Sequence, residues 1–289
     1  MYAITGITGQ VGGTLARTLL AAGREVRAVV RDAARGEPWV RQGCEPALAE
    51  LTDVPALIRA FSGAEGVFIL LPPAFDPKPG FPAARRIIAA VREALEMAGP
   101  KKVVALSTIG ADADRPNLLN QLRIMEEQFS TLGLPVTFLR AAWFMENARW
   151  DIDAARAGAI TSYLQPASRA IAMVSTADVG RTAAELLQED WKGRRVVQLE
   201  GPQRTSPDDI AAAFARLLGR EVRVDTVPRA EWEGIFRAQG MENPLPRMQM
   251  VDGFNAGWID FAHGGRESRK GRVGIEAALR AMLDDQAAA

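Results

Sequence analysis

The chain has 289 residues, carries 35 basic and 35 acidic side chains, and is 48% hydrophobic, which is typical of a folded globular protein. Balanced charge argues against a protein that coats nucleic acid, because binding the phosphate backbone needs clustered Lys and Arg. With one cysteine, Cys44, and one histidine, His263, the chain cannot build a Cys-based metal cluster, and most zinc or di-iron sites are excluded. We expect no metal site, so any catalysis must depend on a cofactor or on few side chains.

The residues after Met1 lack the basic segment of a secretory leader, and no charge-free apolar run of about 18 residues occurs. We therefore expect a cytoplasmic protein with no membrane span.

The first half of the chain alternates short apolar segments with segments whose apolar residues recur at helical spacing. Strands are predicted at 2–5, 26–30, 46–48, 67–71, 103–106 and 136–139, and helices at 11–22, 54–61, 81–98 and 118–132. A proline-rich loop at 72–79 is either a lid or a rigid connection. This alternation predicts an α/β fold with a doubly wound parallel sheet, the Rossmann arrangement.

The second half is less regular. Strands are predicted at 196–199 and 222–227, helices around 179–187 and from 206 onward, and a mixture of loop and helix at 143–155. We expect a dinucleotide-binding domain over residues 1–150 and a smaller C-terminal α/β substrate lobe over 151–289, with segments around 175–200 packing back on the sheet.

Several side chains of the second half carry more specific predictions. Aromatic spacing predicts a helix through Met250, Phe254, Trp258 and Phe261, which is either core or, with Trp143 and Phe144, the lining of an apolar pocket. The basic residues Arg266, Arg269, Lys270 and Arg272 are expected in a solvated turn. His263 is expected in a loop, and Cys44 is expected to be an inert thiol.

A glycine motif follows the first strand and opens the first helix, with Gly6, Gly9 and Gly12 spaced as G-x-x-G-x-x-G. In a dinucleotide-binding fold the first glycine allows a sharp turn, the second admits a pyrophosphate, and the third lets the helix approach the strand. The amides of Gly9, Gln10 and Val11 would then point at the phosphates from the helix N-terminus. The alternative is a merely tight turn between strand and helix.

The second strand ends where this fold selects its cofactor, and there the signal is mixed. An acid at this position binds the ribose of NAD, whereas Arg suits the 2′-phosphate of NADP. Arg31 is followed directly by Asp32, and both could also be plain turn residues. We predict that Arg31 binds the phosphate and that the cofactor is NADP.

These segments, together with VVRD at 29–32, VFILLPP at 67–73, VVALSTIGA at 103–111 and LRAAWFMEN at 139–147, resemble the NmrA-like group of atypical short-chain dehydrogenases/reductases. That group includes isoflavone-reductase-like enzymes, NADPH:quinone reductases and non-enzymatic NADP-sensing regulators. The resemblance implies cofactor contacts after the third, fourth and sixth strands. Together with the glycine motif and the polar end of the fifth strand, the predicted cofactor-binding residues are Gly6, Thr8, Gly9, Gln10, Val11, Gly12, Arg31, Glu50, Leu51, Leu71, Pro72, Pro73, Ser107, Ala142, Trp143 and Phe144.

The chain departs from the wider group at its catalytic pair. The Tyr and Lys positions are Leu118 and Leu122, whereas Glu126 matches an acid that many NmrA-like members keep. No catalytic residue can therefore be named. We predict an NADP(H)-dependent oxidoreductase that transfers hydride to a small quinone-like or aromatic acceptor, because the cofactor carries that chemistry. The alternatives are a non-catalytic NADP(H) sensor with a regulatory protein partner and, last, a sugar-nucleotide epimerase.

Overall fold

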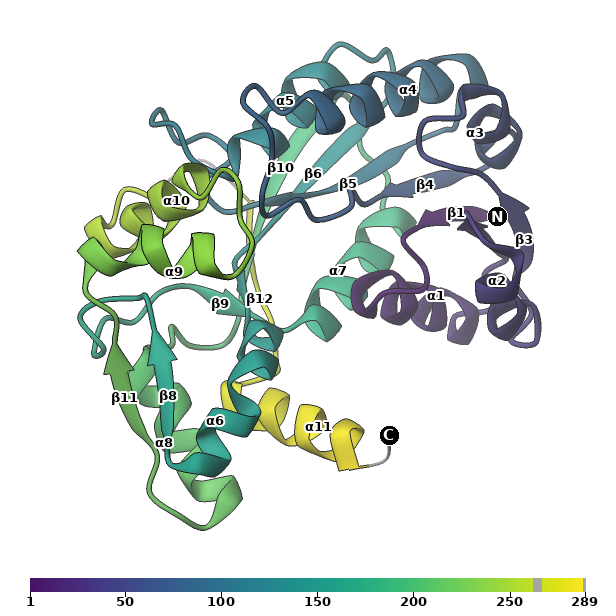
Figure 1. The fold of residues 1–289 in the computed structure, drawn as a ribbon. Helices are drawn as coiled ribbons and strands as arrows, with labels where there is room; N and C mark the ends of the chain where they lie inside the picture. Colours follow the sequence, from purple (N-terminus) through teal and green to yellow (C-terminus); the bar gives the residue numbers. More distant parts are fainter. Residues whose placement is uncertain (262–266, 288–289) are drawn as a thin grey trace.

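The computed structural model describes residues 1–261 and 267–287. Within that part of the chain, eight parallel strands form one sheet in the order β12–β10–β6–β5–β4–β1–β2–β3, with a smaller lobe beside it (Figure 1). The strands are β1 (Tyr2–Thr5), β2 (Val26–Val30), β3 (Glu45–Leu48), β4 (Gly66–Ile69), β5 (Val103–Thr108), β6 (Val136–Ala141), β10 (Arg194–Glu200) and β12 (Glu267–Lys270). The strand order reverses between β1 and β4, so the predicted doubly wound sheet is confirmed.

Helices cover both faces of the sheet (Figure 1). One layer holds α3 (Val54–Phe61), α4 (Pro82–Ala98) and α5 (Asn120–Phe129), and the other holds α1 (Gln10–Ala21), α2 (Ala33–Val40) and α7 (Thr176–Gln188). The pleat of each strand divides its side chains between two cores. In β1, for example, Ala3 joins the core under α3 and α4, and Ile4 joins the core under α1 and α7.

The backbones of α1 and α7 pack closely against each other, although residues 22–175 separate the two helices in sequence. A Cβ added to Gly180 would lie only 2.7 Å from the Val11 carbonyl oxygen and 2.7 Å from the Thr14 Cβ. The glycine therefore lets the two helices touch, and it brings the N-terminus of α7 beside that of α1. The Thr176 hydroxyl donates to the side-chain carbonyl of Gln10 at 3.3 Å.

The smaller lobe joins elements from several parts of the chain (Figure 1). It contains β8 (Ala159–Ser162), β11 (Arg223–Thr226), α6 (Ile152–Ala157), α8 (Pro207–Leu218), α9 (Trp232–Ala238) and α10 (Leu245–Ala256), with 3₁₀ turns at Met145–Asp151 and Arg229–Glu231. The short strands β7 (Trp143–Phe144) and β9 (Met173–Val174) pair at its junction with the sheet, and α11 (Ile275–Ala287) packs on α8. The predicted opening of α8 is confirmed, with Ser206 and Asp209 forming a capping box.

Helix α2 was not predicted, because Gly36 and Pro38 lie inside it. Both residues are poor helix formers, yet tertiary contacts favour this helix. Asp32 caps its N-terminus by accepting the Ala34 amide at 2.9 Å, and Trp39 is buried against Gly13 of α1. Packing of one aromatic ring therefore outweighs a weak local propensity.

Two other predictions in the second half were wrong. The aromatic helix stops at Ala256, because Gly257 adopts a left-handed conformation with φ of 79°, so Trp258 and Phe261 lie beyond it. Arg269 and Lys270 belong to the edge strand β12, where both form ion pairs with acidic side chains, whereas Arg272 is exposed in a bend, as predicted. His263 and Arg266 lie outside the described residues.

Candidate functional site

The site is built at the carboxyl ends of β1 and β4, where the strand order reverses and a crevice is expected in this class of sheet. The buried hydroxyl of Thr5 fastens the two strand ends together. It donates to the Phe68 carbonyl at 3.0 Å and accepts the Leu70 amide at 2.9 Å. Gly6 follows with φ of 65°, and a Cβ added there would contact the Leu70 side chain at 3.3 Å. The chain can turn sharply off β1 because this position is glycine.

The third glycine brings α1 against this turn. A Cβ added to Gly12 would lie 2.3 Å from the carbonyl oxygen of Gly6 and 2.9 Å from the Cα of Ile7. Both atoms belong to the backbone and have no rotamer that could relieve the contact. The approach of the helix to the strand, which the spacing predicted, therefore depends on glycine at position 12.

The N-terminus of α1 keeps free donors. Gly9 is its N-cap and provides no side-chain cap, and within the described residues the amides of Gln10, Val11 and Gly12 have no hydrogen-bond acceptor. Thr8, Gly9 and Gln10 are exposed. Free amides at the positive end of a helix dipole form a site for an anion. The Gly9 amide itself was predicted to be a donor, but it is used internally and donates to the Gly6 carbonyl at 3.0 Å.

Arg31 and Asp32, which follow β2 and gave a mixed signal for the choice of cofactor, have different surroundings in the structure. The Asp32 carboxylate is engaged as the cap of α2. Arg31 is exposed, and its guanidinium has no hydrogen bond or ion pair with any described residue. The acid is thus committed to the fold, and the cation remains available for a ligand.

The other predicted contacts lie at the same edge of the sheet, because parallel strands share the edge where they end. Glu50 and Leu51 follow β3, and Leu71, Pro72 and Pro73 follow β4, whereas Ala142, Trp143 and Phe144 follow β6. Pro72, Pro73 and Glu50 are exposed, and Leu71, Trp143 and Phe144 are half-buried. Their role as cofactor contacts stays a prediction.

A buried ionic network lies beside the ends of β5 and β6. Arg140 binds both carboxylate oxygens of Glu126, at 2.8 and 2.6 Å, and lies 2.7 Å from Asp112. Burial disfavours the charged guanidinium, but Glu126 and Asp112 outweigh burial and raise the pKa of Arg140. The Ser107 hydroxyl donates to Glu126 at 2.5 Å. Ser107 was predicted to contact the cofactor; its hydroxyl donor is engaged with a carboxylate, and its role as a cofactor contact stays a prediction.

The two positions at which related reductases have Tyr and Lys hold leucines in this chain, and both leucines lie in apolar surroundings. Leu118 is buried ahead of α5, and Leu122 packs on the core between α5 and the sheet.

Cys44 is also buried, which raises the pKa of its thiol and is consistent with the expected inert residue.

Glu146 and Thr176 belong to the site, although sequence reasoning did not select them. Both carboxylate oxygens of Glu146 accept the Thr176 amide, at 3.0 and 2.9 Å, and burial raises the pKa of this acid. Thr176 in turn holds the carbonyl end of the Gln10 side chain, so the other end of that amide is left to donate. Glu146, in the segment after β6, thus helps through Thr176 to position Gln10, the first residue of α1.

The proline-rich loop after β4 is fastened to the smaller lobe. The Asp76 carboxylate accepts the amides of Glu242 and Asn243 at 2.8 and 2.7 Å, and the Asn243 side chain donates to the Pro77 carbonyl at 2.8 Å. These bonds join the carboxyl edge of the sheet to the segment between α9 and α10. The loop therefore forms a clasp between the two parts of the molecule.

The reversal of strand order, the uncapped helix and the three glycines indicate a dinucleotide site, and comparison with known proteins agrees. Residues 6–190 match the model of a family described as NAD(P)H-binding. The chain belongs to this family. The expected resemblance to NmrA-like, atypical short-chain dehydrogenases/reductases is thereby confirmed.

The chain is similar to proteins that are named as reductases. The chain is 26% identical over 246 residues to the NAD(P)H azoreductase of Xenophilus azovorans, covering 85% of this chain and 83% of that protein. It is 25% identical over 251 residues to quinone oxidoreductase 2 of Escherichia coli K12, covering 86% of this chain and 85% of that protein.

Within the described residues, no helix is long and apolar enough to cross a membrane.

Solved structures share the fold. An NADPH-dependent quinone oxidoreductase of Escherichia coli in complex with NADPH superposes with a TM-score of 0.80 at 22% identity, over 98% of this chain and 100% of that chain. A Citrobacter triphenylmethane reductase in complex with NADP(H) gives 0.80 at 21% identity, over 98% and 100%.

Proposed function

We propose that this protein is an NADPH-dependent oxidoreductase that reduces quinone-like or related aromatic acceptors in the cytoplasm. The observation that carries the proposal is the open N-terminus of α1, where the amides of Gln10, Val11 and Gly12 are free beside the Gly6 turn. Two relatives of similar length act on a quinone and on azo compounds, as their names state.

The residues present fit a dinucleotide. The free amides and the helix dipole of α1 would hold the pyrophosphate, and Gly9 leaves room for it, since the nearest heavy atom to an added Cβ is 3.4 Å away. Gln10, which Thr176 orients, would add a side-chain donor. Trp143 and Phe144, which follow β6, would border the nicotinamide. These contacts need no surplus of basic residues, in keeping with the zero net charge.

Arg31 supports NADP over NAD. A guanidinium binds a phosphate through charge-assisted hydrogen bonds, and the neighbouring Asp32 is held by the N-terminus of α2. We expect Arg31→Ala to weaken NADPH binding about tenfold or more, with NADH binding changed less than twofold. Calorimetric titration of both cofactors measures this, and equal loss for both would contradict the assignment.

Reduction of a quinone fits a site without a side-chain acid. When bound, the nicotinamide supplies a hydride, which is two electrons and one proton. The second proton that completes the hydroquinone can come from water, because the reduced ring delocalises its negative charge. Leu118 and Leu122 are apolar where carbonyl reductases need a proton donor, so neither side chain can supply that proton.

The test is turnover of NADPH by the purified protein with a panel of benzoquinones, naphthoquinones and azo compounds. We expect oxidation of NADPH well above background with at least one quinone, and Gly9→Ala should abolish it. Absence of turnover with every acceptor would contradict the proposal. If calorimetry then showed that the protein distinguishes NADP+ from NADPH, the result would favour a sensor with a protein partner.

A further inference from the structure

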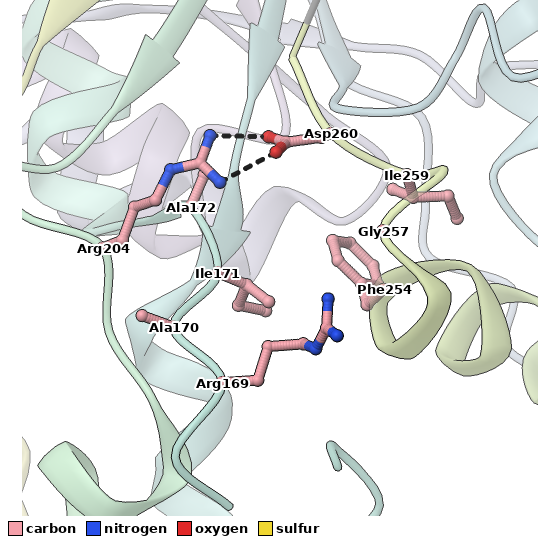
Figure 2. Close-up of a pocket in the computed structure, with 9 residues that line it drawn as sticks. All are labelled: Arg169, Ala170, Ile171, Ala172, Arg204, Phe254, Gly257, Ile259 and Asp260. Carbon is pink, nitrogen blue, oxygen red and sulfur yellow. Dashed lines mark hydrogen bonds and ion pairs between the residues drawn. The ribbon is translucent and has the colours of Figure 1, made fainter. Parts of the chain in front are cut away.

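A small cavity lies in the smaller lobe, with Phe254 among the side chains that line it (Figure 2). It lies between the segment that leads into β9 and the C-terminal end of α10, and its volume is about 40 Å³. Its lining includes Arg169, Ile171, Arg204, Phe254 and Asp260. A pocket of this size admits a small polar or charged group but not a whole ring.

The cavity carries an uncompensated positive charge. Arg204 is neutralised, because its guanidinium binds both oxygens of Asp260, at 2.8 and 2.7 Å (Figure 2). Arg169 reaches toward Phe254 in the same view, and its side chain has no hydrogen bond or ion pair with the described residues. Residues 262–266, AHGGR, contain no acid that could pair with it.

Arg169 is an exposed residue whose guanidinium lies beside the end of α10. A Cβ added to Gly257 would lie 3.5 Å from Nη1 of Arg169, so the guanidinium lies against the last turn of α10. Carbonyl groups at a helix C-terminus attract a cation. Glycine at position 257, with φ of 79°, both ends the helix and leaves this space open.

Phe254, which lines the cavity, also contacts Trp143 of the candidate site. The rings of Phe254 and Trp143 form an edge-to-face pair with centroids 5.2 Å apart. On the other side of the same junction, the carbonyl of Ala172, which lines the cavity, accepts the Trp143 amide at 3.2 Å. An aromatic acceptor beside Trp143 could thus extend a substituent past Phe254 to Arg169.

We propose that Arg169 binds an acidic substituent of the acceptor, so that the preferred substrates are aromatic compounds that carry a sulfonate, carboxylate or phosphate. This inference rests on the proposed reductase function and specifies its substrate class. Phe254, whose ring pairs with that of Trp143, would lie beside the aromatic acceptor, and Ile171 and Arg169 would contact its acidic substituent, with Arg169 binding the charge. Arg suits this role because its fork of N–H groups matches two oxygens of one anionic group.

Binding of non-reducible ligands tests the inference independently of turnover. Naphthalene-2-sulfonate and its neutral isostere naphthalene-2-sulfonamide are titrated into the protein with NADP+ present. We expect the sulfonate to bind about tenfold more tightly. Arg169→Ala should remove this preference, and Arg169→Lys should keep part of it. Arg59→Ala, an exposed arginine on α3, is the matched control and should keep all of it.

Kinetics separate this inference from the function on which it rests. With 1,4-naphthoquinone and its 2-sulfonate as acceptors, Arg169→Ala should lower kcat/KM for the sulfonate about tenfold and change the value for the neutral quinone less than twofold. Equal loss for both acceptors, or an unchanged preference in the binding assay, would overturn the role of Arg169. Turnover of neither acceptor by the wild-type protein, with the binding preference intact, would instead contradict the reductase function.

Discussion

Two alanine substitutions in the glycine motif should separate folding from cofactor binding. At Gly12, a Cβ would lie 2.3 Å from the Gly6 carbonyl oxygen, whereas ordinary contacts begin near 3.4 Å. Helix and strand would have to part by about 1 Å, and such overpacking costs about 1–3 kcal/mol. Alanine in a helix offsets about 1 kcal/mol of this. We expect a net loss of up to about 2 kcal/mol in the free energy of unfolding and, because Gly6 is displaced, loss of NADPH binding.

Gly9→Ala is the matched variant at the same turn. Its Cβ would lie 3.4 Å from the same carbonyl oxygen, so the fold can accept it, and replacing this N-cap should cost less than about 1 kcal/mol. The methyl group would nevertheless occupy the space that the pyrophosphate needs. Urea unfolding and NADPH titration of both variants measure the two effects. A Gly12→Ala variant that both unfolds and binds NADPH like the wild-type protein, or unchanged NADPH binding by Gly9→Ala, would refute the reasoning.

Four further substitutions test other parts of the structure. Burial raises the pKa of Asp151 from 3.8 to about 6, so the folded state holds the proton more tightly than the unfolded state, and the ionised residue destabilises the protein above pH 6. Asp151→Asn should therefore add up to about 3 kcal/mol to the unfolding free energy at pH 8 and almost nothing below pH 4, which urea titrations at the two pH values measure. Glu126→Gln should cost about 3 kcal/mol in the same assay, because Arg140 loses its buried carboxylate. Asp76→Ala should release the clasp, which hydrogen exchange detects as faster exchange of the amides at 242–243. Thr176→Val should raise the Kd for NADPH several-fold without altering the unfolding transition, because Gln10 loses its orienting bond; unchanged affinity would contradict that role.

The parts of the site that sequence reasoning found are those in which one local segment carries the signal. Gly6, Gly9 and Gly12 lie within seven residues, and the turn, the free helix end and the close approach all follow from their spacing. The parallel sheet was equally accessible, because each buried strand is a continuous apolar run. Even the departure at Leu118 and Leu122 could be read directly from the chain.

The parts that were missed depend on contacts between distant residues. Asp32 could not be recognised as a cap while α2 was hidden by Gly36 and Pro38. The bond between Thr176 and Gln10 joins positions 166 residues apart, and no periodicity records it. The aromatic stripe that ends at Phe261 has helical spacing, but the helix stops at Gly257, whose left-handed conformation prevents the stripe from continuing.

The position of β12 has a consequence for synthesis of the chain. This strand pairs with β10 at the edge of the sheet, yet it follows the whole of the smaller lobe in sequence. While the ribosome is still making residues 201–266, β10 is therefore an open edge with unpaired backbone groups, the kind of surface on which nascent chains associate. Arg194 and Arg195 stand at the start of that strand, and their charges discourage such pairing until Glu267–Lys270 is made and pairs with β10.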